Sequence, residues 1–193
     1  MKKKRKAIGI IVILFIIISL LLIGILYFLV MSGAVFSLMP DPPAPEITYG
    51  EFDYKLVYEL NDETKVSEGT FICEFAGFYS LGSAGKYRKW NMHLNNDENY
   101  ITLLDLSNGD VVDDFNHKIL KLYFSPGNPG YYMGDNSIDI GQQPWDLKWI
   151  DYMYEDTDGT IGHSGYRADE AYEKYKIKLI SWEVSSPIQN SFH

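Results

Sequence analysis

An uncharged apolar run near the N-terminus most constrains what this chain can fold into. Residues 8–30 carry no charge and are mainly Ile, Leu, Val and Phe. As an α-helix rising about 1.5 Å per residue, the run can cross a hydrocarbon core of about 30 Å. Basic residues favour the cytoplasmic side of a membrane, and residues 2–6 are all basic. We therefore predict a basic cytoplasmic tail over 1–6 and a transmembrane signal-anchor region over 7–39, in contact with the lipid bilayer of the plasma membrane.

Cleavage of this segment as a signal peptide is the alternative to anchoring. The small residues Ser32, Gly33 and Ala34 have the spacing that a signal peptidase prefers, so a cut after Ala34 is conceivable. Signal peptides, however, have apolar cores of about 7–15 residues, and this run is much longer. Tyr27 and Phe28 also suit an aromatic belt at the outer interface. We expect an uncleaved, single-pass anchor with the C-terminal domain extracytoplasmic.

Charge separates the anchor from the rest of the chain. All 26 acidic residues follow Pro40, together with 12 basic ones, so the outer part carries a net charge of about −14. Such a domain repels nucleic acid, whose binding needs Lys and Arg to neutralise phosphates, and it favours basic partners or cations. A single cysteine, Cys73, allows no internal disulfide. The outer domain must therefore be held together by its core.

After a Pro-rich spacer over 40–45, the sequence changes to the period-two alternation of β-strands. From Ile47 to Leu60 apolar residues alternate with polar ones, with one slip at Gly50-Glu51 where a β-bulge would fit. Residues 46–193 therefore predict one mainly-β extracytoplasmic domain, an antiparallel sandwich or barrel-like fold. The further strands are expected at 70–78, 86–94, 100–106, 118–125, 146–154 and 175–184, separated by Gly, Pro, Asn and Asp turns, with a short helix at 168–174.

Several segments resemble those of small single-pass membrane-anchored proteins of Gram-positive, clostridia-like bacteria. The resemblance covers nearly the whole chain and is carried by the basic-apolar anchor and by residues 45–52, 72–75, 86–90, 131–135 and 175–183. That family is uncharacterised. The resemblance implies a bacterial cell envelope setting and supplies no active-site positions.

Motifs for covalent catalysis are not found. Gly162-His163-Ser164-Gly165 places a serine beside a histidine but lacks the Gly-x-Ser-x-Gly spacing of a nucleophile elbow, so we interpret it as an exposed glycine-rich loop. Cys73 lies in an apolar strand, where a free cysteine packs as a small hydrophobic residue. The many carboxylates offer no distinguishable pair for glycoside hydrolysis; they include Asp113, Asp114, Asp135, Asp139 and Asp151.

Metal and cofactor motifs are equally weak. The four histidines are scattered singly, without the paired spacing of zinc sites. The segment that starts at Asp156 opens like a calcium loop, but Ile161 and Arg167 occupy the positions where an EF-hand needs glycine and glutamate. We predict no cofactor and no metal site; a looser calcium site at Asp156 and Asp158 stays open beside a plain Asp/Gly turn.

Aromatic residues give the one candidate ligand face. About one outer residue in six is aromatic, and Tyr131, Tyr132, Trp145 and Trp149 flank loops rich in Gly and Pro. Flat rings can bind sugars or peptides, although core packing explains aromatic residues in strands equally well.

We therefore expect a membrane-anchored binding protein rather than an enzyme, with an envelope protein or a cell-wall component as its ligand. The alternatives are a carboxylate-based cell-envelope hydrolase and an envelope immunity or inhibitor protein whose negative charge masks a basic partner.

Overall fold

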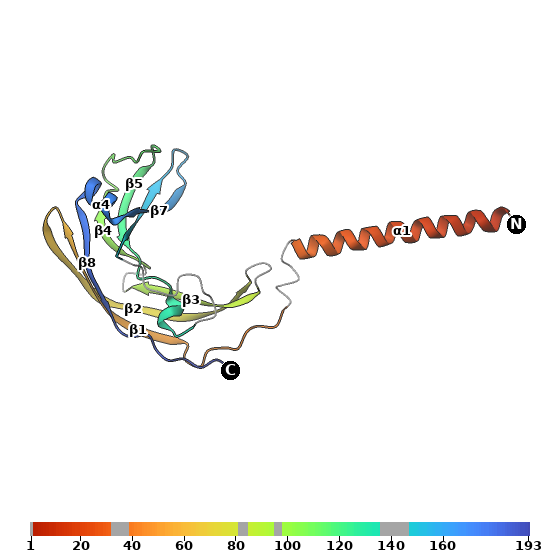
Figure 1. Cartoon of the computed structure of the whole chain (residues 1–193), viewed down its shortest axis with the longest axis horizontal. Coiled ribbons are helices and arrows are strands. Elements are labelled where there is room, and N and C mark those ends of the chain that lie inside the picture. The colour runs from red at the N-terminus through yellow and green to blue at the C-terminus, as the bar shows by residue number, and fades with distance from the viewer. Residues whose placement is uncertain (1, 32–38, 81–84, 95–97, 136–146) are drawn as a thin grey trace. The chain divides into compact units, whose positions relative to one another are not determined.

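The computed structural model describes residues 2–31, 39–80, 85–94, 98–135 and 147–193 (Figure 1). One long helix, α1 (Lys2–Met31), precedes a mainly-β part with eight strands in the described ranges. The chain divides into two compact units, residues 1–43 with 78–88, and residues 44–77 with 89–193. The N-terminal apolar helix and the predicted mainly-β, antiparallel class are confirmed.

In the first unit, the spacer contacts the start of β3 (Lys86–Leu94). Lys86 Nζ lies 2.8 Å from Asp41 Oδ1, and the guanidinium of the buried Arg88 donates to the Pro43 carbonyl at 3.0 Å. Within α1, the apolar window Ile13–Val30 has a mean hydropathy of 3.2 and none of it is buried. The helix is therefore long and apolar enough to cross a membrane.

Two antiparallel four-stranded sheets form the β part. The first has the order β3-β2-β1-β8, with β1 (Tyr49–Leu60), β2 (Glu63–Ser80) and β8 (Ile177–Val184). The second has the order β4-β5-β6-β7, with β4 (Ile101–Asp105), β5 (Lys118–Phe124), β6 (Trp149–Glu155) and β7 (Ile161–Arg167). In Figure 1, β1, β2 and β8 curve together like part of a barrel wall.

A tight hairpin starts the first sheet. Asn61 and Asp62 both have positive φ, 52° and 63°, as expected for a two-residue type I′ turn. Leu60 pairs directly with Glu63, so β2 begins seven residues earlier than the predicted strand at Thr70. The predicted bulge at Gly50-Glu51 is wrong because both residues pair in regular register with β2; the irregularity in β1 lies at Val57/Tyr58, against β8.

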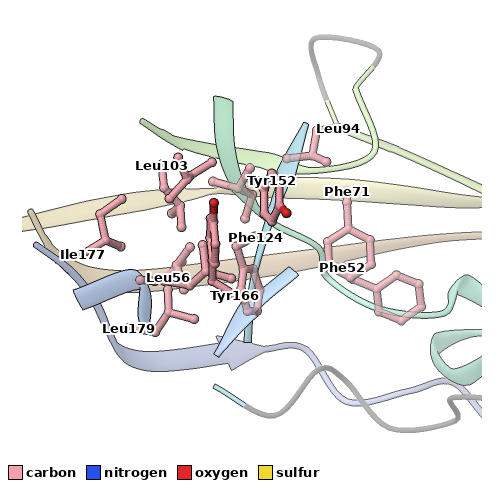
Figure 2. Close-up of a cluster of buried hydrophobic side chains, with 14 of the residues drawn as sticks. Phe52, Leu56, Phe71, Leu94, Leu103, Phe124, Tyr152, Tyr166, Ile177 and Leu179 are labelled. Carbon is pink, nitrogen blue, oxygen red and sulfur yellow. The ribbon is translucent and has the colours of Figure 1, made fainter. Parts of the chain in front are cut away.

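One shared core joins the two sheets. Figure 2 shows side chains from both sheets converging, and the rings of Phe124 on β5 and Trp182 on β8 lie 4.8 Å apart. At about 25 cal/mol per Å² of apolar surface removed from water, such burial is the main force holding a domain without disulfides together. The buried members include Phe52, Leu56, Phe71, Cys73, Ile119, Leu122, Phe124, Ile150, Tyr152, Ile177 and Leu179.

The described part of the second unit also contains two short helices. α3 (Pro129–Tyr132) begins with proline and is capped by Asn128, whose Oδ1 accepts from the Gly130 amide at 2.8 Å. α4 (Ala168–Tyr175) matches the predicted helix at 168–174 and ends at Lys176 in the left-handed conformation.

The polar C-terminal segment pairs with the end of the spacer. Ala44 and His193 exchange two backbone hydrogen bonds of 3.0 Å, and Asn190 clamps Ile47 through its side-chain amide. The last residues of the chain therefore hold the entry to β1.

Candidate functional site

Polar and aromatic side chains gather on the outer face of the second sheet. On β6, Ile150 and Tyr152 face the core, so Asp151 between them points outward. Tyr123 on β5 lies directly opposite Asp151, and Gly165 on β7 lies opposite it on the other side. Residues opposite each other in an antiparallel pair share a face. Three neighbouring strands thus contribute to one surface.

His163 completes this group from the edge strand. It stands two residues before Gly165 and therefore shares its face, and its Nδ1 lies 3.0 Å from the Tyr123 hydroxyl. The tautomer of the imidazole decides which of these two atoms donates. Burial raises the pKa of Tyr123 to about 12, with the nearby Asp151 carboxylate adding to the effect. Tyr123 is therefore a neutral hydrogen-bonding group.

The Asp151 carboxyl group is the unusual member of the site. Burial raises its pKa above the ordinary aspartate range, while the nearby His163 acts in the opposite direction. Within the described ranges no hydrogen bond or ion pair engages this carboxyl group. A partly desolvated carboxylate without a protein partner is costly, and such groups occur preferentially at functional sites.

These side chains line a cavity of about 290 Å³ formed by Asn99, Tyr100, Tyr123, Ser125, Asp151 and His163. The rings of Tyr100 and Tyr123 lie 4.6 Å apart. Lys121 Nζ contacts the Tyr100 hydroxyl at 3.0 Å and Glu98 Oε1 at 3.4 Å, which fixes the Tyr100 ring from the neighbouring strand. The site thus combines aromatic rings with groups that donate and accept hydrogen bonds.

The absent side chain at Gly165 keeps space free beside the carboxyl group. A Cβ at this position would lie 3.3 Å from Asp151 Oδ1 and 3.6 Å from Cε3 of Trp149. Trp149 stands two residues before Asp151 on β6 and is 42% exposed. Its ring therefore borders the outer face from the end of the strand.

The described residues of the predicted ligand face, Tyr131, Tyr132 and Trp149, do not form one surface. Tyr132 is fully buried, packs on Phe52 and Phe71, and donates its hydroxyl to the Pro126 carbonyl at 2.6 Å. Its assignment to an exposed face is therefore wrong. Tyr131 is half-buried and packs edge-on against Tyr132. Trp145 lies outside the described residues, and of the three described members Trp149 borders the site.

The other residues considered for chemistry, Cys73 and the Asp156 and Asp158 pair, make contacts that stabilise the fold. Cys73 is fully buried and burial raises its pKa to about 12, as expected of a packed hydrophobic residue. Asp156 and Asp158 accept hydrogen bonds from Thr157 and Thr160 in the turn between β6 and β7. In the described part of the chain no group of three His, Cys, Asp or Glu side chains could hold a metal ion.

Asp113 and His117 form a second polar cluster, in the loop before β5. One carboxylate oxygen of Asp113 accepts from the backbone amides of Phe115 and His117, and the other lies 3.0 Å from His117 Nδ1. The imidazole stacks on Tyr154 with the ring centroids 4.5 Å apart. Every carboxylate contact serves the loop itself, so the cluster stabilises the fold.

Sequence reasoning missed the site because it missed β7. Gly162-His163-Ser164-Gly165, interpreted as an exposed loop, is the centre of this strand. The ring of Tyr154 covers Gly162 so closely that a Cβ there would lie 2.3 Å from its Cζ, and this cross-strand packing replaces the missing side chain. Alternation alone can indicate which side chains of β5 and β6 point outward. That His163 lies beside them depends on the register of β5, β6 and β7.

No protein-family model, no curated protein and no solved structure matches this chain. The resemblance to clostridia-like membrane-anchored proteins stays an expectation from the sequence. The function is therefore inferred from the chain's own residues.

Proposed function

We propose that this chain is a single-pass, membrane-anchored binding protein of the bacterial cell envelope, with its β domain outside the plasma membrane. Its ligand would bind in the cavity around Tyr123, Asp151 and His163 on the outer face of the second sheet. One observation carries this proposal: a partly buried carboxyl group without a protein partner lines a cavity together with aromatic rings.

Anchoring is supported by α1. Its apolar window is unburied, and it follows the basic residues 2–6, which favour a cytoplasmic N-terminus. Mass spectrometry of the mature protein from membranes is expected to find residues 2–5 still attached. Recovery of a soluble form that begins near Val35 would show cleavage and refute anchoring.

Binding is favoured over hydrolysis by the composition of the cavity. Carboxylate-based glycosidases need two carboxyl groups facing the scissile bond, about 5–10 Å apart. Asp151 is the one carboxylate among the six described residues that line the cavity, so the described lining offers no carboxylate pair. The hydrolase alternative therefore has less support than binding. The immunity or inhibitor alternative rests on the acidic surface alone, without a defined site.

Photocrosslinking in native cells tests the proposed site before its ligand is known. A benzophenone amino acid replaces Trp149, which borders the site and is 42% exposed. The matched control replaces Tyr172 on α4, which is 40% exposed and lies outside the lining of the cavity. We expect an adduct of defined mass at position 149 and none of that mass at position 172.

A second change ties the adduct to the cavity. Asp151→Asn keeps the shape of the side chain and removes its charge, so the yield of the adduct at position 149 should fall. Equal adducts at both positions, or a yield insensitive to Asp151→Asn, would refute a ligand site on this face.

A further inference from the structure

The site cavity adjoins a second and larger cavity in the same compact unit. This second cavity, of about 510 Å³, is lined by Trp90, Asn91, Met92, His93, Asn99, Ser125, Gly127 and Pro129. Asn99 and Ser125 line both cavities, so the two cavities are neighbours at these residues. Small-molecule sites usually measure about 300–1,000 Å³, and the site cavity alone is at the bottom of that range. A ligand that fills both cavities is elongated.

The lining residues indicate the chemistry of such a ligand. Among the described residues that line the two cavities there is no lysine or arginine, while Asp151 contributes a carboxyl group. An anionic polymer would meet the Asp151 carboxyl group there, and the acidic outer domain would repel it. The amide, hydroxyl and imidazole groups of the lining residues instead offer hydrogen bonds to uncharged hydroxyl and amide groups of a ligand in both cavities.

Aromatic rings in both cavities are held in fixed orientations. Trp90 Nε1 donates to Asp135 Oδ2 at 2.8 Å, and its ring packs edge-on against Phe75 with the centroids 5.4 Å apart. In the site cavity, Tyr100 is held by Lys121 and packs against Tyr123. Rings fixed in advance lose little conformational entropy when a ligand stacks on them, which increases affinity.

From these observations we infer that the two cavities together bind a linear, uncharged oligosaccharide. This inference rests on the proposed binding function and names its ligand class. Sugar rings present apolar faces to aromatic side chains and hydroxyl groups to the polar lining. Successive units of one chain would occupy the site cavity, the junction at Asn99 and Ser125, and the cavity beside Trp90.

Calorimetric titration of the full-length chain in lipid nanodiscs tests the inference. The probes are β-1,4-linked N-acetylglucosamine oligomers from the monomer to the hexamer, with anionic hyaluronan oligomers as the charged comparison. We expect affinity to rise with chain length until both cavities are filled, and no binding of the anionic series.

Variants separate the two cavities. Asn91→Ala removes a hydrogen-bonding group found only in the second cavity, so it should weaken the hexamer about three- to tenfold and leave the shortest binding oligomer unchanged. Asn99→Ala, at the junction, should weaken the long oligomers as well. Thr64→Ala, an exposed polar truncation on β2, lies outside both linings and serves as the matched control.

The outcomes distinguish this inference from the proposed function. Affinity independent of length, or unchanged by Asn91→Ala, would overturn the extended site while leaving the cavity at Asp151 in place. Failure of every uncharged oligomer to bind would overturn the sugar class. In either case the crosslinking at Trp149 decides independently whether the face binds a ligand at all.

Discussion

Replacing Tyr132 by alanine should remove a large part of the stability of the β domain. This side chain is fully buried, and its ring lies 5.3 Å from Phe52 and 4.8 Å from Phe71, measured between centroids. Truncating a buried aromatic residue costs about 3–5 kcal/mol through lost burial and the cavity left behind. The Pro126 carbonyl also loses its donor, which adds about 1 kcal/mol or more. The free energy of unfolding should therefore fall by about 4–6 kcal/mol, against a total of about 5–15 kcal/mol for a typical domain.

Two further substitutions separate the parts of this effect. Tyr132→Phe keeps the ring and leaves the Pro126 carbonyl unsatisfied, so the loss should be about 1–3 kcal/mol. In a domain of this size, each kcal/mol of lost stability lowers Tm by about 2–4 °C. Trp149→Ala removes a half-exposed ring of similar bulk and should change the free energy of unfolding by about 0.5 kcal/mol or less.

Urea denaturation of a fragment beginning at Asp41, followed by far-UV circular dichroism, measures all three variants. The expected order of midpoints is wild type and Trp149→Ala together, then Tyr132→Phe, then Tyr132→Ala, with similar m-values. If Tyr132→Ala and Trp149→Ala unfolded at the same urea concentration, Tyr132 would not be a core residue and the packing argument would fail.

Three further predictions concern the second sheet and its loops. Gly162→Val places side-chain atoms within the ring of Tyr154 and should lower the free energy of unfolding by about 1–3 kcal/mol; an unchanged urea midpoint would contradict the close packing of β7. Burial raises the pKa of Asp113, but the hydrogen bonds from His117 outweigh this effect, so the pKa lies below its ordinary value. The ionised carboxylate therefore stabilises the fold at a pH above its unfolded pKa, and this stabilisation is lost as the pH falls. Asp113→Asn should therefore cost stability at pH 7 and less in acid, and a pH-independent difference in Tm would exclude this linkage. The effect of Asp151 on stability has the opposite sign, because burial raises its pKa and its ionised form therefore destabilises the fold. Asp151→Asn should stabilise the domain at neutral pH, and the gain in Tm should vanish as pH falls through the raised pKa. A loss of Tm at pH 7 would count against the unpartnered carboxylate.

The sequence by itself determined the local features of this protein. The apolar run gave the helix α1 because its length and lack of charge need no tertiary context to be recognised. Alternation predicted the ranges of β3 and most of β5 and β8, and the turn at Asn61 and Asp62 consists of residue types that tolerate positive φ. These are signals carried within a few residues of one another.

Only the tertiary structure decided which of these residues meet. The strand β7 has too few side chains of its own to show period two, and it exists because Tyr154 covers Gly162 and the backbone pairs with β6. Tyr131 and Tyr132 are neighbours in sequence, yet the α3 turn sends Tyr132 into the core and leaves Tyr131 half-buried. Because a side chain's face and partners depend on strand register across the sheet, no local pattern could bring Tyr123, Asp151 and His163 together.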